Sequence, residues 1–303
     1  MTTWRCNRKR TAVLLCLTAL LVFLVASRRN ARTHASLERM RSLLRPAFAP
    51  SGRMQLTPRE ALDACVLAAR QYCSERQPDE HAAPRRWPGQ TATWSRSQSR
   101  LHWCGHPATV TTEIADSLQH LAEENSGNEI RIEEGVFLSM ANSNSSVLSW
   151  NIVEHPLVML IRIYTNLRQT SVGWAPLARL LPPGPVSLRA VAELALDAAA
   201  GPTAHLLRPA VDVCHFCATH YDFVLHAGEL DVELPHLLDE IGWSSGQWDP
   251  PTRASYDQAL SEAVRLVPTL PVPLMVRLKQ HYAADLDLYG FEFDVDAIYR
   301  ALA

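Results

Sequence analysis

The first candidate for chemistry is the loop at residues 105–112, GHPATVTT, which lies between an expected strand and an expected helix. Such a loop binds anions well, because its free N–H groups and the helix dipole both favour a phosphate. Thr109, Thr111 and Thr112 add hydroxyl groups there. The loop has one glycine and no lysine, so it is not a Walker phosphate loop. An ordinary capped helix start explains the same pattern.

A second candidate is the run Cys214-His215-Phe216-Cys217, which has His205 and His220 nearby. Cysteine and histidine are ligands that zinc prefers, and a structural zinc site needs four ligands at workable spacing. The C-x2-C-x2-H spacing is too short for an ordinary zinc finger. We therefore expect no metal here, and instead a disulfide or packing role for the two cysteines.

Cysteine pairing is only partly decided by spacing. Beyond the apolar N-terminal run there are five cysteines: Cys65, Cys73, Cys104, Cys214 and Cys217. Because five is odd, at least one is free or pairs with a second chain, so a homo-oligomer is compatible with the sequence, either disulfide-linked or non-covalent. Cys65 and Cys73 are eight residues apart on an expected helix. That places them about 12 Å apart, too far for a mutual bridge.

The overall composition is that of a globular protein and excludes some functions. The chain has 303 residues, 47% hydrophobic and 20% charged, with a net charge of −2. This balance gives no electrostatic footprint for nucleic acid. All but two of the 29 basic residues are arginine, and the lysines are Lys9 and Lys279. Any mechanism that needs a lysine in the middle of the chain is therefore excluded.

The N-terminal region predicts a membrane anchor. Residues 11–27 carry no charge and would rise about 26 Å as a helix, enough for a thin bilayer core. We expect a type II topology, with a cytoplasmic tail at 1–10, a stem at 28–56 and a luminal body at 57–303. The glycosylation sequon at Asn144 fits a luminal body. A cleaved signal peptide or an exported soluble protein are the alternatives.

The body alternates between expected strands and helices, which predicts an α/β fold with a parallel sheet flanked by helices. A capping box, Thr57-Pro58-Arg59-Glu60, opens its first helix, and residues 77–100 are expected to be a connector. Ligands in such sheets lie at the carboxyl ends of the strands. The expected strands are 101–104, 147–153 and 221–225, and the expected helices are 113–124, 157–168, 188–200, 232–241 and, with breaks at prolines, 252–303.

Four segments, in the same order and spacing, resemble the Golgi carbohydrate sulfotransferases of the chondroitin and HNK-1 group. Residues 214–243 resemble the family's C-x2-C pair followed by Tyr-Asp-Phe and an acidic helix, and residues 278–291 its C-terminal tyrosine-rich motif. Residues 100–114 are similar to its Cys-x-x-Pro-Lys loop, which holds the 5′-phosphosulfate. Residues 149–164 are similar to its Val-Arg-x-Pro-x-x-Arg-Leu-x-Ser-x-Tyr motif, which holds the 3′-phosphate.

The resemblance implies a sulfotransferase fold, distantly like P-loop kinases, on an anchored Golgi glycoprotein. It further implies transfer of a sulfo group from 3′-phosphoadenosine 5′-phosphosulfate to a glycan hydroxyl, with no metal. It also implies that loops 105–112 and 154–156 face each other at the carboxyl ends of neighbouring parallel strands. Residues that match or could replace the donor-binding motifs are Pro107, Thr111, Thr112, His155, Arg162 and Tyr164.

The chain departs from the family at the charged positions of both motifs. Ala108 stands where the family has lysine, Glu154 and Met159 where it has arginines, and Arg162 where it has serine. Sulfuryl transfer needs cations that offset charge on the leaving phosphate. Arg162 is the one nearby cation that could take over part of this role.

Three functions therefore stay open: an active sulfotransferase; a degenerate relative that binds a glycan or a protein partner in the Golgi; and an unrelated anchored luminal protein. No residue stands out as a catalytic base. The histidines near the motifs are His102, His106, His155 and His226.

Overall fold

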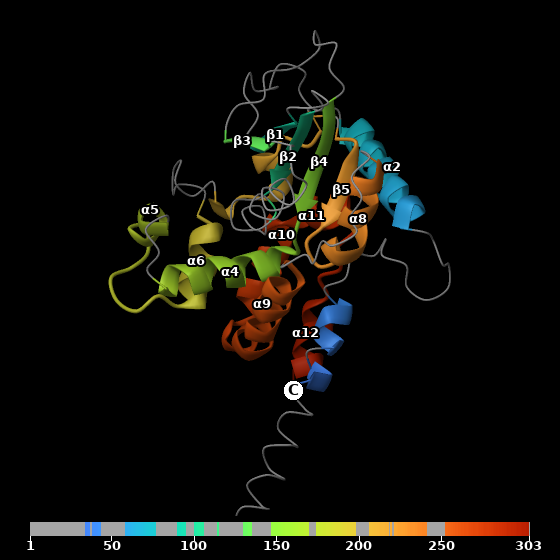
Figure 1. The fold of residues 1–303 in the computed structure, drawn as a ribbon. Helices are drawn as coiled ribbons and strands as arrows, with labels where there is room; N and C mark the ends of the chain where they lie inside the picture. Colours follow the sequence, from blue (N-terminus) through green and yellow to red (C-terminus); the bar gives the residue numbers. More distant parts are fainter. Residues whose placement is uncertain are drawn as a thin grey trace, which may run out of the picture.

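A five-stranded sheet in the order β3-β1-β2-β4-β5 forms the centre of the fold (Figure 1). The structure is a computed structural model. It describes residues 34–36, 38–43, 58–76, 90–94, 100–105, 114, 130–134, 147–169, 174–197, 206–217, 219, 221–240 and 252–302.

Three neighbouring strands of this sheet are parallel, as expected: β2 (Arg100–Gly105), β4 (Val147–Val153) and β5 (Phe223–His226). Trp103, Trp150 and Phe223 lie side by side in the register and are buried. Residues 149–153 of β4 are all buried, as in a strand covered on both faces, although Ser149 and Asn151 interrupt its apolar side chains. The expected strands at 101–104, 147–153 and 221–225 are thus confirmed to within two residues.

The sheet also has an antiparallel half that the sequence reading missed. β1 (Gln90–Trp94) pairs antiparallel with both β2 and β3 (Ile130–Glu134). The expected parallel sheet therefore accounts for three of the five strands, and the expectation that residues 77–100 are a connector is wrong, since β1 lies within them. The sequence of β1, QTATW, is short and has no apolar run. Strands of this kind form because a partner strand pairs with them, rather than from local preference.

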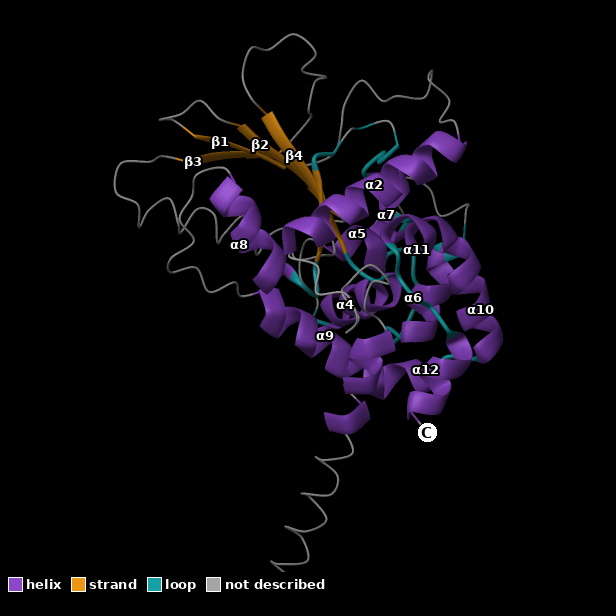
Figure 2. Ribbon diagram, turned by 90° about the vertical axis from the view of Figure 1, so that its right-hand side faces the viewer, coloured by secondary structure: helices purple, strands orange, loops and turns teal. Residues whose placement is uncertain are grey.

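Helices cover the sheet and the end at which β4 stops (Figure 2). α2 (Pro58–Arg76) and α8 (Leu230–Glu240) pack beside β5, while α4 (Pro156–Arg168) leaves β4 and packs against α6 (Leu188–Ala195) and α9 (Thr252–Leu266). α6 ends five residues earlier than expected, and of the helix expected at 113–124 only Ile114 lies within the described residues. The remaining elements are α5 (Ala175–Ala178), α7 (Ala210–Val213), η4 (Val267–Thr269), α10 (Val272–His281), α11 (Ala283–Tyr289) and α12 (Val295–Leu302).

Part of the expected stem belongs to the folded body. Residues 34–36 and 38–43 are helical, and they are the blue segment at the lower end of Figure 1. Met40 is fully buried in the hydrophobic core, and Leu43 packs against that core. Among the described residues no helix has the length and hydropathy to cross a bilayer, and the expected anchor at 11–27 lies outside them.

Two disulfides join distant parts of the chain. Cys73 of α2 bonds Cys217, and Cys104 at the end of β2 bonds Cys214, while Cys65 is free and buried. The prediction that Cys73 needs a distant partner is therefore confirmed, as are the disulfide role of the C-x2-C pair and the odd free cysteine. Both cysteines of that pair are bonded elsewhere, which leaves no thiolate there for zinc.

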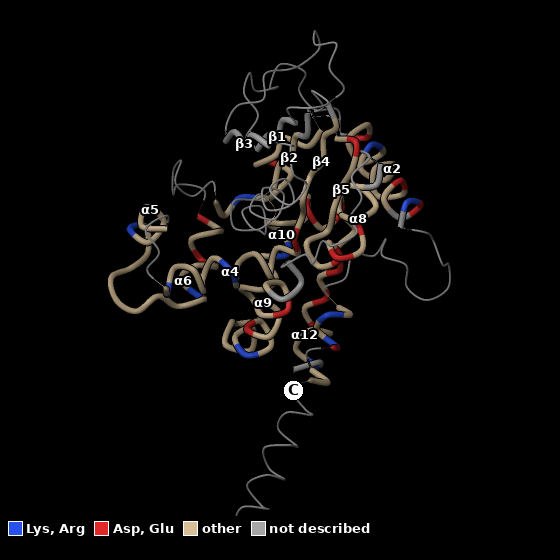
Figure 3. The backbone as a smooth tube through the Cα atoms, viewed as in Figure 1, with Lys and Arg blue, Asp and Glu red and all other residues tan. Residues whose placement is uncertain are grey.

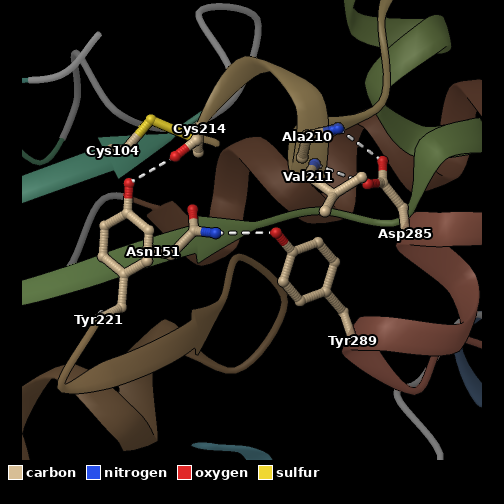
Figure 4. The surroundings of a disulfide bond; sticks show 8 residues. All are labelled: Cys104, Asn151, Ala210, Val211, Cys214, Tyr221, Asp285 and Tyr289. Atoms are coloured by element: carbon tan, nitrogen blue, oxygen red, sulfur yellow. Dashed lines mark hydrogen bonds between the residues drawn. A yellow bond between two sulfur atoms is a disulfide. The ribbon is translucent and has the colours of Figure 1, made fainter. Parts of the chain in front are cut away.

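Hydrogen bonds tie the C-terminal helices to the same region (Figure 4). Both carboxylate oxygens of Asp285 in α11 accept backbone N–H bonds, from Ala210 at 2.7 Å and Val211 at 2.8 Å. Asn151 of β4 donates to the Tyr289 hydroxyl at 2.9 Å. The end of the chain is therefore part of the core that positions β4.

Candidate functional site

The carboxyl ends of the parallel strands form the edge at which ligands bind in such folds. Cys104 lies opposite Asn151 and Gly105 opposite Ile152, so β2 and β4 end at the same edge. The prediction that the two motif loops leave neighbouring parallel strands is confirmed to this extent. Several predicted residues lie outside the described residues: His106, Pro107, Ala108, Thr109, Thr111, Thr112, Asn144, His205 and His220.

A small hollow lies at the carboxyl ends of β4 and β5. Residues 153–155 and 226–229 line it, together with Arg41, Tyr256 and Phe291. Its free volume is about 10 Å³, close to what one water molecule occupies.

A buried ion pair joins two residues of the segment that resembles the family's 3′-phosphate motif. The Nε of Arg162 donates to Oε1 of Glu154 at 2.7 Å, and the side chains are 11% and 0% exposed. A second nitrogen of the Arg162 guanidinium donates to the hydroxyl of Ser255 on α9. Arg162 is thus held by groups of the protein itself, and Glu154 takes the place of an anionic ligand.

His155, predicted as a donor-binding residue, holds the start of α4. Its Nδ1 accepts from the Leu157 N–H at 3.1 Å, and its Nε2 lies 3.1 Å from the Glu292 carbonyl, to which it donates. Phe291 and Phe293 contact the ring edge-on. Burial lowers the pKa of His155 to about 4. A neutral ring with both nitrogens bonded fits a structural cap better than a catalytic base.

Tyr164, also predicted for donor binding, lies about two turns beyond the start of α4. It is nearly buried, and the Arg168 guanidinium lies 5.6 Å from its ring centre. The structure does not bring Tyr164 to the hollow. His102 of β2 is fully buried, and burial lowers its pKa to about 4.

His226, at the end of β5, is also buried, but its pKa is raised where those of His102 and His155 are lowered. Its Nδ1 lies 3.0 Å from Oε1 of Glu233, and its Nε2 lies 3.4 Å from the Tyr289 carbonyl. Burial alone lowers the pKa of His226, but the charge and hydrogen bond of Glu233 and the carbonyl of Tyr289 outweigh it, so the pKa is raised. Two acceptors around one ring stabilise the imidazolium.

A pH dependence of stability follows. Because folding raises the pKa of His226, its contribution is complete below the unfolded value near 6.5 and is lost as the pH rises through the folded value. We expect the free energy of unfolding, measured by urea titration, to fall more steeply above about pH 6.5 in wild type than in His226→Gln. Parallel curves for the two proteins would contradict the charged pair.

Tyr256 of α9 closes one side of the hollow. Its ring lies so close to Gly228 that a β-carbon added at Gly228 would meet the ring at 3.0 Å. Glycine at this position allows the β5–α8 turn to approach α9. Burial raises the pKa of Tyr256 above its ordinary value, so its hydroxyl stays protonated.

Arg41, like Tyr256, is a residue of the site that sequence reasoning missed. It lies in the expected stem, yet it lines the hollow and pairs with Asp257 of α9 and, at 2.8 Å, with Glu38. No local signal distinguishes Arg41 from the other arginines around it, because its partner is more than two hundred residues away in sequence. Basic and acidic positions are interspersed along the described chain, so individual pairs decide the charge near the hollow (Figure 3).

Nothing in the described part of the chain forms a group of three or more His, Cys, Asp or Glu residues that could hold a metal. No family model, curated protein or solved structure matches this chain.

Proposed function

We propose that this chain is a Golgi protein built on the carbohydrate sulfotransferase plan whose donor site has closed, and that it binds a glycan or a protein partner. The observation that carries the proposal is the buried Glu154–Arg162 pair at the end of β4. A donor phosphate at this edge would have to displace Glu154 from Arg162, or else lie against the Glu154 carboxylate.

Donor binding is weakened because cations are missing from both motifs. Charge-assisted hydrogen bonds to phosphate are each worth about 1.5–3 kcal/mol. Three positions where the family has cations carry none here: Ala108, Glu154, whose carboxylate repels a phosphate, and Met159, while Arg162 is engaged within the chain. Loss of three such bonds removes several orders of magnitude in donor affinity, since about 1.4 kcal/mol is a factor of ten.

The structure suggests how to test this proposal by restoring the family pattern. The triple variant Ala108→Lys, Glu154→Arg and Arg162→Ser supplies two of the three missing cations, leaves Met159 in place, and removes the arginine that would otherwise lie against the new one. We expect wild type to show little heat of binding in calorimetric titration with 3′-phosphoadenosine 5′-phosphate. We expect the triple variant to gain about 2–5 kcal/mol in binding free energy. Tight binding by wild type would refute the closed site.

Active sulfo transfer is the second candidate, and Arg162 favours it because it is a cation within the segment that the resemblance assigns to the 3′-phosphate. In that case the Arg162 guanidinium releases Glu154 and binds the phosphate instead. Arg162→Ala would then abolish donor binding by wild type, whereas a closed site has no binding to lose.

A luminal location is part of the proposal. Two disulfides between distant segments are typical of proteins that fold in the secretory pathway. Together with the apolar run at 11–27 and the sequon at Asn144, they support an anchored Golgi protein with its body in the lumen. Glycosidase treatment of the protein expressed in cells should shift its gel mobility, and Asn144→Gln should abolish the shift. A protein that carries no glycan and is released by carbonate extraction would contradict this topology.

A further inference from the structure

The N-terminal helical segment and the hollow are in direct contact. We call residues 34–43 the latch, of which the structure describes all but residue 37. Met40 inserts into the core, and the neighbouring Arg41 lines the hollow. One residue of the latch thus anchors it while the next forms part of the wall of the candidate site.

The polar contact that holds the latch lies on the site itself. Arg41 donates to the carboxylate of Asp257, which follows Tyr256 on α9. This contact raises the pKa of Arg41, against the opposing effect of its partial burial. The guanidinium therefore joins the latch to the helix that closes the hollow on the other side. Removal of the Arg41 wall would therefore enlarge a hollow that now has room for about one water molecule.

From this geometry we infer that the latch is an intramolecular lid, and that its release opens the hollow to ligands. The closed state is the one described here. Residues 44–57 connect the latch to α2, so a cut within them leaves the latch held by non-covalent contacts alone. A body released by such a cut would have an open hollow, whereas a body released by a cut before residue 34 would keep its lid.

This inference rests on the proposed function in one respect, because it treats the hollow as the ligand site. Its test measures access to the hollow and not ligand binding. A failure of the lid and a failure of the proposed function are therefore distinguishable.

The experiment uses the full chain in detergent micelles, with Cys6→Ser and Cys16→Ser to remove the cysteines of the tail and the apolar run. Glu229→Cys places a thiol in the wall of the hollow, and its rate of reaction with a maleimide reports access. Cys65 is a built-in folding control, because it is buried and unbonded and stays unreactive while the body is folded. The protein without the reporter gives the background.

We expect the thiol of Glu229→Cys to react about tenfold faster in the protein with Arg41→Glu than in its parent. A loss of about 1.4 kcal/mol in the free energy of latch closure produces this change. Arg39→Glu is the matched control, since it makes the same charge change at an exposed position of the latch. It should leave the rate unchanged. Exchanging the charges, with Arg41→Asp and Asp257→Arg together, should restore slow labelling.

A second route does not depend on substitution. With a specific protease site placed within residues 44–57, cleavage followed by dilution should release the latch and raise the labelling rate. If Cys65 becomes reactive in Arg41→Glu, this cut protein decides the question. Equal labelling rates with the latch present and removed would overturn the proposal.

Discussion

Replacement of Arg162 by alanine should lower the free energy of unfolding by about 3–5 kcal/mol, as measured by urea titration. The cause is the buried charge of Glu154, the partner that remains. Glu154 has a fully buried side chain, and loss of Arg162 leaves its carboxylate without the charge that compensates its removal from water. Ser255 also loses its hydrogen bond to the guanidinium.

Two variants separate this electrostatic cause from simple loss of packing. Arg168→Ala truncates an arginine on the same helix that is exposed and contacts Tyr164, and it should cost less than about 1 kcal/mol. Glu154→Leu combined with Arg162→Met removes both charges and keeps apolar volume, so it should recover most of the lost stability. If Arg162→Ala were no more harmful than Arg168→Ala, the pair would not be the buried contact described.

Removal of the Cys104–Cys214 disulfide is the second change with a large expected effect. The bridge closes a loop with a sequence separation of 110 residues. Cross-links over loops of this length stabilise by about 4–5 kcal/mol in the chain-entropy description. Cys104→Ala with Cys214→Ala should reduce the free energy of unfolding by that amount.

The free cysteine supplies the control for this prediction. Cys65→Ala also removes a buried sulfur but breaks no cross-link, and it should cost about 1 kcal/mol. Dithiothreitol should destabilise wild type more than the double variant, in which only the Cys73–Cys217 bridge remains to be reduced. If the reductant left wild-type stability unchanged, the pairing of Cys104 with Cys214 would be contradicted.

The parallel half of the sheet could be predicted because its signals are local. β4 is an apolar run that ends at a turn with proline, and α4 follows with its own apolar stripe. The same reasoning missed β1 and β3, whose pairing depends on strands elsewhere in the chain. It also ended α6 too late, because alanine-rich sequence favours helix beyond the point at which the structure ends it.

The candidate site was found in outline, and its internal contacts were not. Motif order pointed to the edge where β2 and β4 end, and the departures at Glu154 and Arg162 were visible in the sequence. That these two residues pair with each other depends on how α4 leaves β4. That His155 caps α4 and bonds Glu292 depends on the C-terminal segment returning to the same place.

The sequence by itself determined the three parallel strands, the helices that follow β4 and β5, the odd free cysteine, the absence of a central lysine, and the departures from the family motifs at Ala108, Glu154 and Met159. These follow from residue types and short spacings. Only the tertiary structure decided which cysteines pair, that the end of the expected stem belongs to the body, and that Arg41 and Tyr256 close the hollow. Each of these depends on contacts between residues far apart in sequence. The physical reason is that burial and ion pairing act through space, so the partner of a charge such as Asp257 is chosen by the fold and not by its neighbours in the chain.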